Sequence, residues 1–136
     1  MPDLISNYKI LPKQNLVIQY HKGILSLNNY IHFAKDLYSD SNYSPNLNHI
    51  IHIKNTEFRA SFNDLNAYVE FSKINFTKPK HRYIAVITKT PNQIVIPTLF
   101  KMLGKKTSQT VEIFSTSKAA VEWLKIDIAI LKEIAI

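Results

Sequence analysis

The chain has 136 residues, enough for one domain with a substantial core, and it contains no cysteine. The lack of cysteine excludes disulfides, thiolate zinc sites and a cysteine nucleophile, and it suits a reducing cytoplasm, where we expect the protein to reside. Apolar residues make up 46% and charged residues 20%, a balance typical of a folded domain, and neither a signal peptide nor a membrane span is expected.

The net charge of +7 is concentrated in one stretch of the chain. Residues 71–111 include eight basic residues and no Asp or Glu, whereas the remainder holds nine basic and ten acidic residues. Such a stretch favours anionic partners, among them phosphates, acidic proteins, nucleic acid and lipid surfaces. The simpler alternative is a solvated, lysine-rich face that keeps the protein soluble.

The N-terminal segment predicts a β-hairpin. Apolar and polar residues alternate around Tyr8 and Ile10, residues 12–15 have the composition of a turn, and the alternation resumes from Leu16 to Tyr20. Gly23 is expected to end the hairpin, because glycine often interrupts regular structure.

Helices and strands are expected to alternate in the rest of the chain. Ser26 precedes apolar residues at helical spacing and is expected to cap the first helix. Short apolar runs predict three buried strands, at His49–Lys54, Tyr83–Ile87 and Val111–Phe114. The other helices are expected to start at Ser61, at Thr90 and at Ser117. Because Pro97 would kink a helix that starts at Thr90, a start near Ile96 is the alternative.

The resulting order, ββαβαβαβα, indicates a single α/β domain over residues 1–136. Strands that alternate with helices form a mostly parallel central sheet with right-handed crossovers, and the N-terminal hairpin adds one antiparallel strand.

Titratable residues offer no recognisable catalytic or metal site. His49 and His52 lie three apart in an expected strand, so their side chains should point to opposite faces and cannot readily share a metal. Glu57 is the carboxylate best placed to belong to an active site, because active sites of open α/β sheets lie at strand carboxyl ends. A solvated carboxylate without a catalytic role is the simpler interpretation. We therefore expect no enzyme, no metal and no cofactor.

Nucleic-acid binding is also not expected. The basic stretch contains Phe76, Tyr83 and Phe100, but Tyr83 belongs to an expected core strand, so these aromatic residues form no evident stacking surface.

The two glycines of the chain are too few for a dinucleotide-binding or Walker loop.

The segment 50–65, the helix start at Thr90-Pro91 and the closing residues 119–124 resemble a known family. They look like the STAS-like domains, named for sulfate transporters and anti-sigma factor antagonists, in their divergent SpoIIAA-like branch. The resemblance extends over nearly the whole chain in the order of its elements. It implies a SpoIIAA-like fold and a non-catalytic, regulatory module that contacts a protein partner.

The resemblance also implies a candidate regulatory residue, Ser61. In regulatory members of the family, a buried strand leads to an Asp-Ser pair at the start of the next helix, and the serine is reversibly phosphorylated. Here Phe58 matches the apolar position before the pair and Ser61 matches the serine, whereas Ala60 replaces the aspartate. A helix cap at Ser61, with Asp64 favourable to the helix dipole, is the alternative role.

A second possible function is that of a carrier for a small apolar or anionic, lipid-like ligand, since related folds include lipid-binding domains. Its site would lie between the third helix and the sheet, with Lys89, Lys101 and Lys105 at the rim.

The C-terminus predicts one long helix over residues 117–136 that mediates homodimerisation. Its apolar residues form two stripes, and a helix docked on its own sheet needs one of them. A second stripe exposed to water predicts a partner, most simply a second copy related by two-fold symmetry. The alternative is that the last turns of this segment fold back on the chain or fray. The expected interface residues are Val121, Leu124, Ile126, Ile128, Ile130, Leu131 and Ile134.

Overall fold

A five-stranded sheet forms the centre of the computed structural model, which describes residues 3–59, 66–67, 70, 81–94, 98 and 109–134. The strands lie side by side in chain order: β1 (Ile5–Leu11), β2 (Leu16–Ser26), β3 (Asn48–Arg59), β4 (Arg82–Ile87) and β5 (Gln109–Phe114). β1 is antiparallel to β2, and every other neighbouring pair is parallel. The expected mostly parallel sheet and the N-terminal hairpin are therefore both present.

The hairpin closes through a 3-10 turn, η1 (Pro12–Gln14), followed by Asn15 in the left-handed region at φ 54°. Asparagine is among the residues that tolerate this conformation, so the turn is compatible with its sequence. The antiparallel pairing of the hairpin ends with Ile5 opposite Lys22, so the expectation that Gly23 ends the hairpin is confirmed. The strand β2 itself continues to Ser26 and pairs with β3 beyond that point. Gly23 has φ 106° inside the strand, a conformation that only glycine adopts at low cost.

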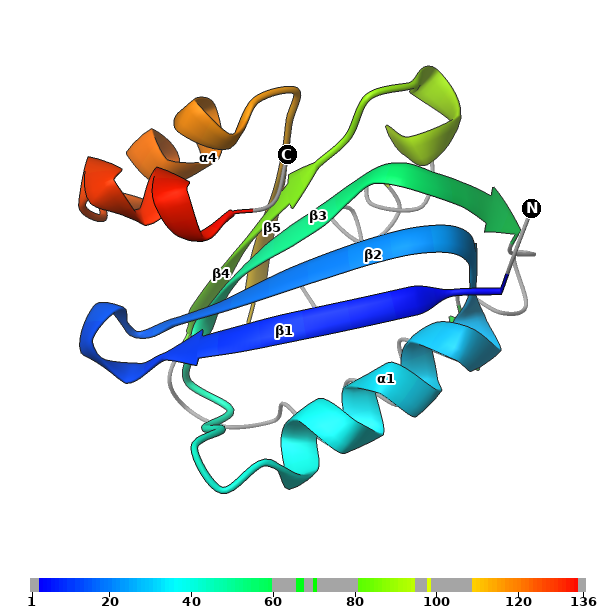
Figure 1. Ribbon diagram of the computed structural model, residues 1–136, viewed down its shortest axis with the longest axis horizontal. Helices are drawn as coiled ribbons and strands as arrows, with labels where there is room; N and C mark the ends of the chain where they lie inside the picture. The colour runs from blue at the N-terminus through cyan, green and yellow to red at the C-terminus, as the bar shows by residue number, and fades with distance from the viewer. Residues whose placement is uncertain are drawn as a thin grey trace.

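Helices cover both faces of the sheet (Figure 1). α1 (Leu27–Ser39) lies on one face and begins at the expected cap, where Ser26 Oγ accepts a hydrogen bond from the backbone N–H of Asn29 at 3.2 Å. Its buried residues Phe33 and Leu37 pack in a cluster with Val17 of β2. α4 (Ser117–Leu124) and the 3-10 helix η4 (Ile128–Glu133) lie on the opposite face.

Two expected helices fall largely outside the described residues. Most of the helix expected from Ser61, and most of the helix expected from Thr90, belong to residues that the structure does not describe. The described start of the latter is a 3-10 turn, η2 (Pro91–Ile94). Within the described residues, no helix is both long and apolar enough to cross a membrane.

The prediction of one helix over residues 117–136 is wrong. α4 ends at Leu124, and Lys125 adopts a left-handed conformation at φ 57°, where its N–H donates to the carbonyl of Glu122. Asp127 then starts η4, with its carboxylate accepting from the N–H of Ala129 at 2.9 Å. The cap of α4 is also one residue earlier than expected, since Thr116 Oγ1, and not Ser117, accepts from the N–H of Ala119.

The reversal at Lys125 buries apolar residues that a straight helix would expose. Ile130 and Ile134 are 6% and 4% exposed, and they pack with Val121 and Ile18 against the sheet. Burying an isoleucine side chain contributes about 1.5–3 kcal/mol, which outweighs the roughly 1–2 kcal/mol cost of one left-handed residue.

The fold-back buries most of the residues that were expected to form the dimer interface. Val121, Ile130 and Ile134 are buried within the chain, and Leu124, Ile126 and Leu131 are half-buried against the same cluster. Of the expected interface residues, Ile128 alone is largely exposed, at 52%. The second apolar stripe is thus mostly covered by the chain itself, and the homodimer stays a prediction.

Candidate functional site

The candidate site lies where β4 leaves the sheet and β3 continues. The pairing of β4 with β3 ends at Ile87, opposite His52, whereas β3 runs on to Arg59. The backbone groups of β3 beyond this point therefore lose their neighbour on the β4 side. The space beside them is a depression at the carboxyl ends of parallel strands, the usual place for ligands in open α/β sheets.

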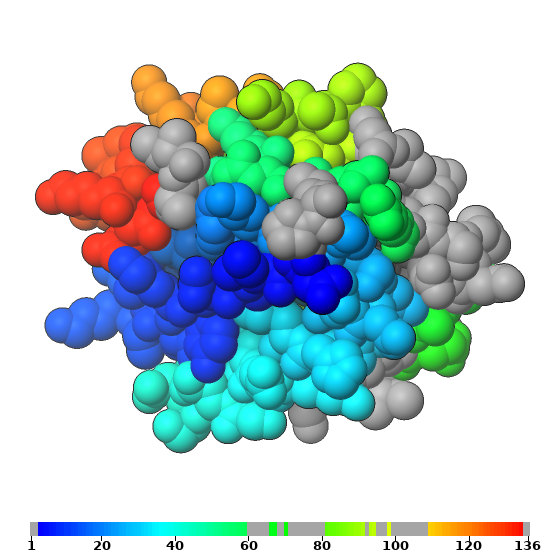
Figure 2. Space-filling view, turned by 45° about the vertical axis from the view of Figure 1, so that its right-hand side comes forward, coloured from blue at the N-terminus to red at the C-terminus, as the bar shows by residue number. Residues whose placement is uncertain are grey.

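One buried side chain, Gln93 of η2, replaces the missing strand. Its Nε2 donates to the backbone carbonyls of Lys54 and Thr56, at 2.9 Å each. Its Oε1 accepts from the backbone N–H groups of Lys89 at 2.6 Å and Thr90 at 3.1 Å. Gln93 is 2% exposed and uses both donors and both acceptor positions of its amide, so it joins the segment after β4 firmly to β3. Figure 2 shows the end of β3 and η2 along the same side of the molecule.

A β-bulge in β3 sets the direction of the side chains at this site. Tyr20 of β2 pairs with His52, but Lys22 pairs with Asn55, so β3 contains one extra residue between these pairs. A bulge re-aims the side chains around it, and bulges are frequent beside functional sites. Here the neighbouring residues Lys54 and Asn55 both line the depression.

The depression has a volume of about 600 Å³ and is called the lysine hollow below. β2, β3 and the segment after β4 contribute its lining residues, which are Lys22, Lys54, Asn55, Thr56, Glu57, Lys89, Thr90 and Gln93. Lys22 and Lys89 are exposed and Lys54 is half-buried. None of these three lysines makes an ion pair within the part of the chain that the structure describes.

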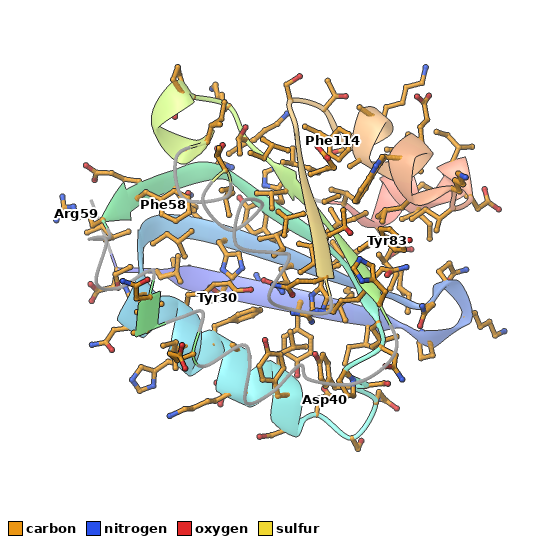
Figure 3. All side chains as sticks on the ribbon, turned by 180° about the vertical axis from the view of Figure 1, so that it is seen from behind. Tyr30, Asp40, Phe58, Arg59, Tyr83 and Phe114 are labelled. Atoms are coloured by element: carbon orange, nitrogen blue, oxygen red, sulfur yellow. The ribbon has the colours of Figure 1, made fainter. Side chains whose placement is uncertain are left out.

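Glu57 is the carboxylate that lines the hollow. It belongs to β3 and not to a loop, and its Oε2 lies 3.2 Å from a guanidinium nitrogen of Arg59. Figure 3 shows Phe58 and Arg59 at this end of β3. The three lysines outnumber the single carboxylate of the lining, and Arg59 lies beside that carboxylate, so the net charge at the hollow is positive.

The sequence-based site residues have mixed outcomes. Lys89 lines the hollow, and its role in binding an anion stays a prediction. Lys101, Lys105 and the candidate regulatory residue Ser61 lie outside the described residues.

Sequence reasoning missed Lys22 and Lys54, which lie outside the basic stretch 71–111. The available signal was their position near the ends of neighbouring parallel strands. Arg82, which belongs to the basic stretch, is 2% exposed and so does not add to a basic surface.

A chain of hydrogen-bonded polar side chains crosses the sheet on the face that α1 covers, and we call it the polar ladder. Its members are Ser6 of β1, Gln19 and His21 of β2, His49 of β3, Arg82 of β4 and Gln109 of β5. Ser6 Oγ is 2.7 Å from His21 Nδ1, and the Gln19 amide is 2.9 Å from a ring nitrogen of each histidine. All members except Ser6 are buried.

Arg82 determines the protonation of the polar ladder. Its guanidinium only donates, so His49 Nε2, at 3.0 Å, accepts and the proton of His49 is on Nδ1. Because a neutral imidazole accepts at one nitrogen, the Gln19 amide must present its oxygen to His49 Nδ1, which requires a half-turn of that amide. The Gln19 nitrogen then donates to His21 Nε2, and His21 Nδ1 donates to Ser6. After the half-turn, the Gln19 nitrogen also occupies the amide position that lies 3.1 Å from the Tyr30 hydroxyl, and both histidines are neutral in this arrangement.

His49 and His52 occupy opposite faces of the sheet, as expected for residues three apart in a strand. His49 belongs to the polar ladder, whereas His52 lies against Tyr20 with ring centroids 5.2 Å apart. Both ring nitrogens of His52 are buried without a hydrogen bond. Burial lowers the pKa of His52, and the nearby Lys54 lowers it further. Among the described residues, no three His, Cys, Asp or Glu side chains cluster as metal ligands would.

Comparisons with known proteins identify a fold. No model of a known protein family matches the sequence, and no curated protein matches it. A solved structure that resembles the chain is that of an uncharacterised protein of the DUF3478 family from Shewanella loihica PV-4, described as having a SpoIIAA-like fold. The TM-score is 0.58 at 15% identity, and the match covers 89% of this chain and 93% of the other. The resemblance noted in the sequence is thus confirmed for the architecture: this chain has the SpoIIAA-like fold.

Proposed function

We propose that this chain is a non-catalytic binding module, and that the lysine hollow receives an anionic group of its ligand. The observation that carries the proposal is the convergence of Lys22, Lys54 and Lys89 on one depression without a carboxylate partner in the described residues. Like charges that face one hollow repel one another, and a bound anion relieves that repulsion while gaining the attraction of all three.

The lining of the hollow supports binding and not catalysis. General acid–base chemistry needs a suitably placed pair of titratable groups, or one such group beside a nucleophile. Glu57 is already paired with Arg59, and the hydroxyl groups of Thr56 and Thr90 have no histidine beside them in the lining. Thr56 Oγ1 donates to the carbonyl of Ile53 at 2.7 Å, which gives it a structural role.

The size of the hollow favours a small ligand. A volume of about 600 Å³ lies within the range of roughly 300–1,000 Å³ that is typical of small-molecule sites. The second candidate function, a regulatory contact with a protein partner, is supported by the SpoIIAA-like fold and would place an acidic segment of the partner in the same hollow.

Substitution of the three lysines tests the proposal. In the variant K22Q/K54Q/K89Q, the hollow loses its charge, and we expect small anions to lose their stabilising effect on the fold. The measurement is thermal unfolding at low salt with inorganic phosphate, sulfate, citrate or a short poly-glutamate peptide. A bound anion raises the melting temperature because it binds the folded chain alone. Stabilisation by the small anions supports the small ligand, and stabilisation by the peptide alone supports the protein contact.

A matched variant separates the hollow from the overall charge. K13Q/K35Q/K118Q removes the same three charges at exposed positions away from the hollow and should respond to anions as the unmodified chain does. The proposal fails if both triple variants lose the response equally, or if no anion stabilises the unmodified chain.

A further inference from the structure

The cations of the lysine hollow are all ammonium groups. A guanidinium forms a flat fork that matches the two oxygens of a carboxylate, whereas an ammonium is a compact point charge without a preferred plane. The Arg59 guanidinium, which lies beside Glu57 of the lining, is engaged with that carboxylate at 3.2 Å. Three separate ammonium groups around one depression suit a tetrahedral dianion, whose oxygens point in several directions, better than a planar carboxylate.

Glu57 adds a second requirement on the ligand. Its Oε2 contacts Arg59, whereas its Oε1 makes no hydrogen bond within the described residues, so one oxygen of this lining residue can still accept. A carboxylate repels a dianion, so its presence among three lysines opposes the binding of a bare anion. A carboxylate is, however, a strong acceptor for a hydroxyl group, and an O–H···O⁻ bond is among the stronger hydrogen bonds.

We infer that the ligand of the lysine hollow is a phosphate monoester with a hydroxyl group close to the phosphate. Lys22, Lys54 and Lys89 bind the phosphate, and Glu57 accepts the hydroxyl hydrogen. This inference rests on the proposed function and specifies the ligand that the binding module takes. It also assigns Glu57 as the residue that distinguishes a polyol phosphate from inorganic phosphate.

Two ligands that differ only in hydroxyl groups test the inference. Glycerol phosphate and propyl phosphate carry the same charge, but propyl phosphate has no hydroxyl. Isothermal titration of the full chain should give an affinity for glycerol phosphate that is at least about tenfold higher, the effect of one hydrogen bond to a charged acceptor. In Glu57→Gln this preference should fall several-fold, because a neutral amide oxygen accepts a weaker hydrogen bond than a carboxylate does. Propyl phosphate should bind more tightly because a repulsive charge has been removed.

The control variant is Glu122→Gln, which removes an exposed carboxylate from α4 and should keep the preference for glycerol phosphate. Equal affinities for the two ligands in the unmodified chain, or an unchanged preference in Glu57→Gln, would overturn the inference. If sulfate or citrate stabilises the chain while neither phosphate ester binds, the inference fails and the proposed function stands.

The phosphate ester has two possible sources, a soluble metabolite or a lipid headgroup. Co-sedimentation with phosphatidylcholine vesicles that contain phosphatidylinositol phosphate distinguishes them. Binding to these vesicles, lost in K22Q/K54Q/K89Q, assigns a headgroup, and binding of glycerol phosphate without vesicle binding assigns a soluble ester. Vesicle binding that the triple variant retains, with no binding of glycerol phosphate, contradicts the inference.

Discussion

Two buried histidines of the polar ladder make the stability of the domain depend on pH. Burial lowers the pKa of His21 to about 3, with a smaller contribution from His52. Burial and the positive charge of Arg82 hold the pKa of His49 well below its ordinary value of 6.5. Below about pH 6.5 the unfolded chain therefore binds protons that the folded chain does not, and acid favours unfolding.

The free energy of unfolding should fall by up to about 1.4 kcal/mol per pH unit for each of these histidines as the pH drops below their unfolded pKa. Above about pH 6.5 the neutral histidines leave the free energy of unfolding at its full value. Below that pH the stability falls, and for His21 the loss continues towards about pH 3. Urea unfolding across this range should show a shallower pH dependence for His21→Gln than for the unmodified chain. The same change at exposed His32 is the control, and equal slopes for His21→Gln and the unmodified chain would refute a neutral His21.

At the scale of elements, local patterns predicted the strands well and their ends less well. The runs around Ile50, Ala85 and Val111 are apolar because helices cover both faces of the parallel sheet, and this pattern is visible in sequence. The continuation of β2 through Gly23 and of β3 to Arg59 depends on a bulge and on pairing between distant segments. A window along the chain contains neither, so both strands were predicted too short.

The fold-back after α4 was predicted only as the alternative to one long helix, for a related reason. Residues 117–136 have a helical period throughout, and no glycine or proline marks the end of the helix at Leu124. The helix ends because Ile130 and Ile134 gain more by packing on the sheet than by continuing the helix. The outcome depends on burial against the sheet, and the helical spacing of apolar residues in the sequence carries no information about that burial.

Two isoleucines of η4 provide a matched test of the fold-back. Ile130→Ala should cost about 2–4 kcal/mol of unfolding free energy, because the side chain is 6% exposed and its removal leaves a cavity. Ile128→Ala should cost less than about 0.5 kcal/mol, because that side chain is 52% exposed. Urea denaturation measures both free energies of unfolding. Similar losses at the two positions would contradict the fold-back and support one continuous helix over residues 117–136.

At the scale of the whole molecule, the lysine hollow combines segments that are distant in the sequence. Lys22, Lys54 and Lys89 belong to three different parts of the chain and meet because their strands are neighbours. Sequence reasoning placed Lys89 in a basic stretch and could not group it with the other two, since register and the β3 bulge bring them together. Gln93, which fixes this geometry through four hydrogen bonds, has no sequence motif at all.

The homodimer predicted from the C-terminal sequence is tested at Ile128, which has the largest exposed fraction among the expected interface residues. If the dimer forms through this region, Ile128→Asp should shift it towards monomer, because it introduces a charge into an apolar contact. Sedimentation at tens of micromolar is the measurement, with Lys132→Asp as a control at an exposed neighbour. A full-length monomer, or a dimer that Ile128→Asp leaves intact, contradicts the prediction.

Binding of an anionic group in the lysine hollow can be followed residue by residue with amide NMR during a titration with glycerol phosphate at low salt. We expect saturable shifts that are largest at Lys22, at residues 54–57 and at residues 89–90, with little change in the hairpin turn at residues 12–15. An affinity in the millimolar range, about 4 kcal/mol of binding free energy, would suffice for this measurement. Shifts that are largest away from the hollow, or that spread evenly over all exposed lysines, would contradict binding in the hollow.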